Sequence, residues 1–118
     1  MAAIERIGNV FYRVGDMEAA ADFYGRVLGL PLKFRDGDRW AAFDVAGLTL
    51  ALEQADGAGG DGGATVSLRV QGLDDFVAAL RERGASVGDI ATGPHERRAD
   101  LTDPSGNKLV LYEPLPRS

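Results

Sequence analysis

The sequence predicts an α+β fold made of two copies of one strand–helix–three-strand unit, which we write βαβββ. The first observation is a weak internal repeat. The segment "NVFYRVGDMEAAADFYGRVLG" aligns with "TVSLRVQGLDDFVAALRERGA", so that Asn9 matches Thr65 and Met17 matches Leu73. Within each copy, alternating apolar residues are followed by apolar residues at helical spacing. A length of 118 residues and a hydrophobic content of 45% are enough for one compact domain with a buried core.

The first unit begins with a strand that places Val10, Tyr12 and Val14 on one face. A helix follows, with Asp16 as its predicted N-cap and Gly29 as its predicted terminator. The apolar positions of this helix are Met17, Ala20, Ala21, Tyr24, Val27 and Leu28.

Three strands complete the first unit. The segment "LPLKFRDGDRWAAFDV" predicts a hairpin that turns at Asp36-Gly37, because Asp-Gly is a strong hairpin signal. Ala46-Gly47 then turns the chain into the strand "LTLALEQ". The leucines that share one face of this strand are Leu48, Leu50 and Leu52.

The second unit follows the same order. Its first strand places Val66, Leu68 and Val70 on one face, and its helix ends at Gly84. The apolar positions of this helix are Leu73, Phe76, Val77 and Leu80. The segments "ASVGDI", "ERRADLT" and "KLVLYE" are its predicted later strands.

We therefore expect a single domain over residues 1–118, with two modules. Module 1 covers about 4–54, module 2 covers about 64–114, and a flexible glycine-rich linker at 55–63 joins them. The linker lacks the Gly-Lys-Ser/Thr ending of a phosphate loop and precedes a strand rather than a helix.

The composition excludes several classes of function. Thirteen basic and eighteen acidic residues give a net charge of -5, which has the wrong sign for coating a phosphate backbone, so we expect no nucleic-acid partner. There is no cysteine, which excludes disulfides, thiolate zinc sites and a cysteine nucleophile. The charged N-terminal stretch does not resemble a secretory signal, and no apolar run reaches membrane-spanning length. We expect a cytoplasmic protein with no membrane partner.

Two segments carry a resemblance to a known family. "RVGDMEAAADFYGRVLGL" is similar to the first strand and helix of the vicinal oxygen chelate superfamily, which includes glyoxalase I, bleomycin-resistance proteins and extradiol dioxygenases. "DPSGNKLVLYEP" resembles the last hairpin of that superfamily, and the likeness extends over residues 7–114. The resemblance implies an open, cup-like mixed sheet formed by both modules, with the helices on its outer face. It also implies a homodimer.

The resemblance further predicts which strand residues face the helices and which line the cup. The residues expected under the helices are Val10, Tyr12, Leu50, Leu52, Val66, Leu68, Leu109 and Leu111. The residues expected to line the cup are Asn9, Phe11, Arg13, Thr49, Ala51, Glu53, Thr65, Ser67, Arg69, Lys108, Val110 and Tyr112.

In the metal-dependent members of the superfamily, His and Glu or Gln side chains from the first and last strands of each module hold a divalent ion. The positions that match those ligands in this chain are Asn9, Ala51, Thr65 and Val110. Alanine and valine side chains cannot coordinate a metal, and neutral amide and hydroxyl groups are weak ligands. We therefore expect no metal ion and no other cofactor.

A shifted ligand set would not restore the metal site. Glu53 lies on the same strand face as Ala51, whereas Glu113 would require the opposite face of its strand. His95 is the single histidine and lies in the polar loop "TGPHERR", where a lone histidine is usually just solvated. One carboxylate and one loop histidine do not make a four-ligand site.

Without a metal, the resemblance favours the bleomycin-resistance-type members, which sequester an antibiotic and perform no chemistry. The candidate contacts to an organic ligand are Asn9, Phe11, Arg13, Trp40, Thr65, Ser67, Arg69, Arg98 and Tyr112. Arg13 and Arg69 occupy equivalent places, where they either face an anion or pair with neighbours such as Glu53 and Asp100. The aromatic residues either contact the ligand or fill the cup or a dimer interface.

Two other classes of function stay open. An enzyme of lyase, isomerase or dioxygenase type would need positioned acid–base groups, for which Glu53 and Tyr112 are the candidates. An interaction module would use the dimer surface or the cup for a protein partner, and a large exposed apolar patch would indicate it.

Overall fold

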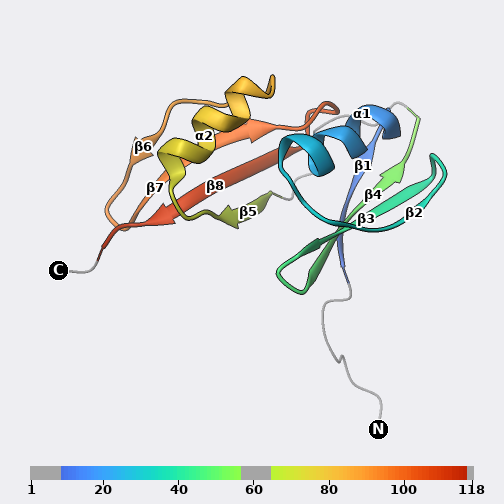
Figure 1. Cartoon of the computed structure of the whole chain (residues 1–118), viewed down its shortest axis with the longest axis horizontal. Coiled ribbons are helices and arrows are strands. Elements are labelled where there is room, and N and C mark those ends of the chain that lie inside the picture. Colours follow the sequence, from blue (N-terminus) through green and yellow to red (C-terminus); the bar gives the residue numbers. More distant parts are fainter. Residues whose placement is uncertain (1–8, 57–64, 117–118) are drawn as a thin grey trace, which may run out of the picture. The chain divides into compact units, whose positions relative to one another are not determined.

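The computed structural model describes residues 9–56 and 65–116 of the chain (Figure 1). Two compact units divide the chain, Met1–Ala58 and Gly59–Ser118, and they correspond to modules 1 and 2. Each unit holds its own four-stranded mixed sheet and its own helical segment, so the prediction of two βαβββ units is confirmed. The predicted linker lies largely outside the described residues.

Module 1 contains four strands and one helical segment. Its elements are β1 (Val10–Val14), α1 (Met17–Asp22), η1 (Phe23–Val27), β2 (Leu32–Asp36), β3 (Trp40–Val45) and β4 (Leu48–Gln54). The strands lie in the order β1-β4-β3-β2, with β1 parallel to β4 and the remaining neighbours antiparallel. This order arises because the helix carries the chain across the sheet, while two short turns join the last three strands.

Module 2 repeats this arrangement. Its elements are β5 (Val66–Arg69), α2 (Leu73–Glu82), β6 (Ala91–Thr92), β7 (Glu96–Thr102) and β8 (Lys108–Pro114). The strands lie in the order β5-β8-β7-β6, with β5 parallel to β8. Gly84 has a φ of 92° and follows the end of α2, as expected for a left-handed terminator.

The helical segment of module 1 changes type halfway along. α1 is capped as predicted, because the Asp16 Oδ1 atom accepts the Ala19 amide at 3.1 Å. η1 is a π-helix, in which the Leu28 amide donates to the Phe23 carbonyl five residues earlier at 2.9 Å. Gly29, with a φ of 78°, follows the last helical turn.

One predicted strand is wrong. The segment at 85–90 is not a strand, since among these residues Val87 alone makes a bridge, with Leu101 of β7. The paired strand is β6, whose Ala91 lies opposite Arg98 in a register shifted by one residue from that bridge. One extra residue therefore interrupts the pairing, as in a β-bulge, and the edge strand is reduced to two residues.

Each helix packs on one face of its own sheet, as Figure 1 shows for α1 and for α2. The residues predicted under the helices that are buried are Tyr12, Leu50, Leu52, Leu109 and Leu111. The prediction is wrong for Val10, which is 42% exposed because it begins the edge strand β1, and Val66 and Leu68 are half-buried. Leu48 shares that face but is 67% exposed, because it begins β4 at the hairpin end. No helix in the described ranges 9–56 and 65–116 is long and apolar enough to span a membrane.

Candidate functional site

The loop "DPSGN" between β7 and β8 has a structural role. The Asp103 side chain is buried, and its Oδ1 atom accepts the Ser105 amide at 2.9 Å and the Asn107 amide at 2.8 Å. Its Oδ2 atom accepts the Asn107 Nδ2 group at 3.0 Å. The carboxylate therefore satisfies the amides of the turn, and the chemistry of module 2 must be sought on the strands.

We call the sheet face that the module's own helix leaves uncovered its open face. On module 1, Phe11 of β1 lies beside Ala51 of β4, and Trp40 of β3 lies on the same face. The Phe11 and Trp40 rings are 5.6 Å apart between centroids, although β4 runs between their strands. The two rings therefore meet above β4, and Ala51 beneath them is 0% exposed.

This aromatic pair occupies the place where the family resemblance implies a metal ligand. A longer side chain at position 51 would enter the space that the Phe11 and Trp40 rings fill. Next to them, Phe34 of β2 lies opposite Ala42 on the same face and is 58% exposed. The open face of module 1 therefore presents an aromatic surface to solvent.

The Arg13–Glu53 pair lies in the next register position of the same face. The Arg13 Nε atom is 3.3 Å from the Glu53 Oε1 atom, on neighbouring strands β1 and β4. Both side chains are substantially exposed, and exposed ion pairs of this kind stabilise a fold by about 0–1 kcal/mol. Of the two roles expected for Arg13, facing an anion or pairing with a neighbour, the structure shows the pairing with Glu53.

The open face of module 2 has a different character. Arg69, Tyr112 and Arg98 lie side by side on β5, β8 and β7, and so do Ser67, Val110 and Asp100 one register position away. The Arg98 Nη2 atom donates to the Asp100 Oδ1 atom at 3.1 Å. This face therefore carries two arginines around one tyrosine, whereas the equivalent positions of module 1 hold Arg13, Glu53 and Trp40.

A cavity of about 450 Å³ opens on this face, and all its lining residues belong to module 2. The lining residues that can contact a polar ligand include Thr65, Ser86, Arg98, Thr102 and Lys108, and Val110 contributes an apolar wall. Sequence reasoning missed Ser86, Asp100 and Thr102 as lining residues. The alternation of β7 from Arg98 would have placed Asp100 and Thr102 on this face.

The described residues do not fit a divalent metal. No cluster of three His, Cys, Asp or Glu side chains that could hold an ion is found within 9–56 and 65–116. Ala51 and Val110, at two of the matching positions, are buried and lack a donor atom. Glu53 pairs with Arg13, and His95 is exposed in its loop. The chemistry of this donor set is wrong for an ion of the first transition row.

Glu113 of β8, the other acid considered for a shifted metal site, directs its carboxylate to the start of α2. Its carboxylate accepts the Gly72 amide at 2.8 Å and the Leu73 amide at 3.3 Å. Gln54 holds the corresponding place in module 1, where its Oε1 atom accepts the Met17 amide at 3.0 Å. Both side chains are thus used to begin a helix, a role that the sequence alone did not reveal.

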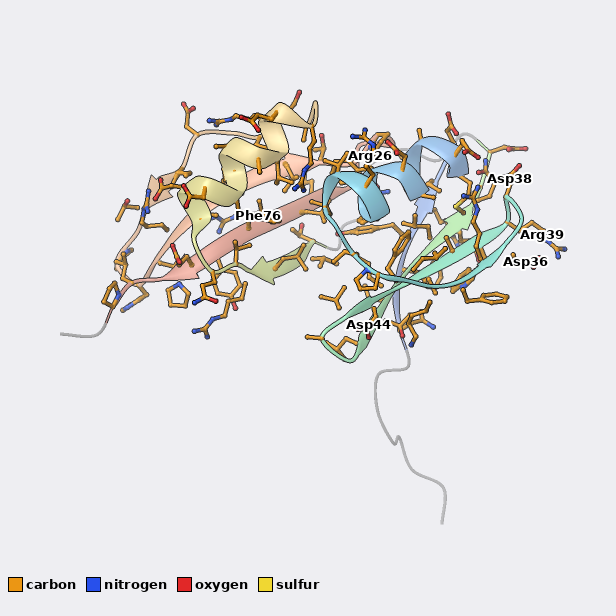
Figure 2. The ribbon with its side chains drawn as sticks, viewed as in Figure 1. Arg26, Asp36, Asp38, Arg39, Asp44 and Phe76 are labelled. Carbon is orange, nitrogen blue, oxygen red and sulfur yellow. The ribbon has the colours of Figure 1, made fainter. Side chains whose placement is uncertain are left out.

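Two carboxylates away from the open faces are held by arginines. Bidentate bonds from Arg26 lower the pKa of Asp22, and bidentate bonds from Arg97 lower the pKa of Asp74. Arg26 is labelled on the helical segment of module 1 in Figure 2. The Arg97 pair joins β7 to α2, and the Arg26 pair lies within the helical segment of module 1, so both pairs stabilise helices rather than form a site.

Comparison with known proteins agrees with this architecture. A family model described as Glyoxalase/Bleomycin resistance protein/Dioxygenase superfamily matches residues 6–111. A protein of Mycolicibacterium smegmatis, named as uncharacterized, is 40% identical over 106 residues, which cover 86% of this chain and 88% of that one.

Two solved structures extend the comparison. TnmS3, an antibiotic binding protein from Streptomyces sp. CB03234, matches with a TM-score of 0.78 and 29% identity, over 98% of this chain and 100% of that chain. A glyoxalase/bleomycin resistance protein/dioxygenase from Nocardioides matches with a TM-score of 0.80 and 22% identity, over 100% of this chain and 89% of that chain. The second likeness concerns the fold alone.

Proposed function

The chain belongs to the glyoxalase/bleomycin resistance protein/dioxygenase superfamily, and we propose that it is a binding member that holds an organic small molecule without a metal ion. The ligand lies on an open face of the sheets, and an antibiotic is the ligand class we favour. Sequestration, in which the bound compound is withheld from its target, then requires affinity but no chemical step.

The observation that carries this proposal is the Phe11–Trp40 pair above Ala51. The two rings occupy the space that a metal-coordinating side chain at position 51 would need, which disfavours a bound metal ion on this face. Phe11 is 44% exposed and Phe34 is 58% exposed, which leaves aromatic surface for a planar or apolar compound. Burying such surface is the main source of affinity for small ligands.

The likeness to TnmS3 supports an antibiotic as the ligand class. That protein is described as an antibiotic binding protein, and the two chains match over nearly their whole lengths at 29% identity. A superfamily fold hosts several chemistries, so the likeness supports the ligand class and the residues of the open face support the mode of binding.

The enzyme alternative has less support. Glu53 is its candidate base, but its carboxylate is partly exposed and is paired with Arg13. Tyr112, the candidate acid, lies between Arg69 and Arg98 on module 2.

Tryptophan fluorescence gives a direct test of the binding proposal, because Trp40 is the single tryptophan of the chain. We expect bleomycin or a planar aromatic antibiotic to change the Trp40 emission in a saturable way, with and without a chelator. Phe11→Ala should weaken binding about tenfold, since it removes half of the aromatic pair. Phe76→Ala, which changes a phenylalanine of α2 (Figure 2), is the matched control and should leave affinity unchanged.

Two outcomes would reject the proposal. One is saturable binding that is lost on adding the chelator and regained with a divalent metal. The other is a Phe11→Ala variant that binds every responding compound as tightly as the unchanged chain.

We also propose a cytoplasmic homodimer. Its support is the set of large apolar side chains that module 1 leaves exposed on the face of its helix, which includes Val10, Leu32 and Leu48. Sedimentation velocity should show a dimer that Leu48→Glu shifts toward monomer. A chain that sediments as a monomer at every loading concentration would reject this assembly.

A further inference from the structure

We infer that the cavity on the open face of module 2 is a binding site for an oxyanion, namely the carboxylate, phosphonate or phosphate group of a small molecule. The cavity measures about 450 Å³, which lies within the range of about 300–1,000 Å³ seen for small-molecule sites. Its lining residues all come from one module, so the site is complete within Gly59–Ser118. This inference concerns module 2 and holds whether or not an aromatic compound binds module 1.

Cationic and hydroxyl groups dominate the polar lining. Arg98 on β7 and Lys108 on β8 bring a guanidinium and an ammonium group to the same cavity. Thr65, Ser86 and Thr102 add hydroxyl groups that can donate to an oxygen atom. Two cations with several neutral donors are what a carboxylate or phosphonate group requires, because charge-assisted bonds to an oxyanion are the strongest hydrogen bonds in proteins.

Val110 explains why an anion is accepted here. The family resemblance implies a metal ligand at this position, and the carboxylate of a glutamate there would repel an oxyanion. The valine carries no such charge, and its hydrocarbon side chain gives the cavity an apolar wall. Charge interactions beside an apolar wall are less screened than in open water. The chain is acidic, with a net charge of -5, so this local group of cations runs against its overall charge.

The Asp100 carboxylate would compete with a bound anion for the Arg98 guanidinium group. Its Oδ1 atom accepts from the Arg98 Nη2 atom at 3.1 Å, and both side chains are about half exposed or more. Such an exposed pair contributes little stability, so a ligand oxyanion can replace the Asp100 carboxylate at low cost. Removing the Asp100 carboxylate should therefore strengthen anion binding, whereas most other substitutions in the cavity would weaken it.

The test compares two probes that differ in charge but hardly in shape, benzoate and benzamide. In isotope-labelled full-length protein, benzoate should shift the amide signals of Thr65, Lys108 and Val110 in a saturable way. Benzamide should leave these signals in place, because it lacks the negative charge. Inorganic phosphate should compete with benzoate, and added sodium chloride should weaken both.

Three variants locate the site. Arg98→Gln and Lys108→Gln should each raise the benzoate Kd by about tenfold or more, while Asp100→Asn should lower it by about twofold or more. Arg39→Gln, which removes an exposed arginine at the β2–β3 tip of module 1 (Figure 2), is the charge-matched control and should not change the Kd. Amide spectra of each variant confirm that module 2 stays folded.

Equal responses to benzoate and benzamide would overturn the inference. So would an absence of saturable shifts with benzoate and phosphate, or an Arg98→Gln and a Lys108→Gln variant that both bind benzoate normally. None of these outcomes bears on the Trp40 experiment, so the two proposals fail independently.

Discussion

Modules 1 and 2 share a sheet order and a helix position but differ on their open faces. The strands pair as β1-β4-β3-β2 in one module and β5-β8-β7-β6 in the other, with a parallel pair at the same place. On the open face, module 1 presents Phe11 and Trp40 at the positions where module 2 presents Ser67 and Arg98, while both modules keep an arginine, Arg13 or Arg69, on the first strand. The alternate residues of a strand can thus change chemistry freely, because the residues between them maintain the core.

The two modules also start their helices differently. α1 has an N-cap side chain, Asp16, as well as Gln54 from β4. α2 follows Gly72, which has a φ of 74° and no side chain to offer, so the Glu113 carboxylate accepts the first two amides. Module 1 therefore has two side chains for this task, and module 2 relies on one.

This difference predicts the largest change in stability. Glu113→Ala should lower the free energy of unfolding by about 1–3 kcal/mol, because it leaves the Gly72 and Leu73 amides at the start of α2 without their charged acceptor. Gln54→Ala should cost about 1 kcal/mol or less, since Asp16 still caps α1. Urea unfolding followed by circular dichroism measures both variants.

Glu113→Gln is the matched control, because it keeps the shape and one acceptor atom, and it should fall between the unchanged chain and Glu113→Ala. If Gln54→Ala lowers the free energy of unfolding as much as Glu113→Ala does, the proposed difference between the two helix starts is wrong.

The turns before the last strands predict a smaller effect. Ala46 in the β3–β4 turn has a φ of 50°, and it is the one described non-glycine residue with a positive φ. Ala46→Asn should raise the free energy of unfolding by about 0.5–1 kcal/mol, because asparagine tolerates this left-handed conformation better than alanine. Thermal unfolding measures the gain.

In module 2, Gly106 takes the left-handed position of the corresponding loop, with a φ of 85°. The reverse change there, Gly106→Ala, should therefore lower the melting temperature. An unchanged or lowered melting temperature for Ala46→Asn would mean that the turn of module 1 carries no strain.

The predictions from sequence hold best where a pattern repeats. The alternation in β1, β4 and β8 placed Tyr12, Leu52 and Leu111 correctly in the cores. It failed at Val10, which is 42% exposed at the start of β1, because alternation assigns a face but does not show where the covering helix stops. It also failed at 85–90, where Val87 pairs in a register that the neighbouring β6 does not continue.

The candidate sites were predictable in part. The matching positions Ala51 and Val110 are visible in the sequence, but the meeting of Phe11 and Trp40 above β4 depends on strand order. The cavity beside Arg98 and Lys108 likewise depends on which strands are neighbours. Long-range pairing of this kind leaves no local signal in a single sequence, whereas turns and caps such as Asp16 do.

Each sheet closes within one continuous half of the chain, and this bears on how the protein folds. The strands of module 1 all come from residues before 55, and those of module 2 all come after 65. The loop that must close before a sheet is complete therefore spans half a chain at most, which keeps the entropy of loop closure and the relative contact order low. An emerging chain can thus complete its first sheet while the second half is still being synthesised, so its β-strands are exposed to aggregation for a shorter time.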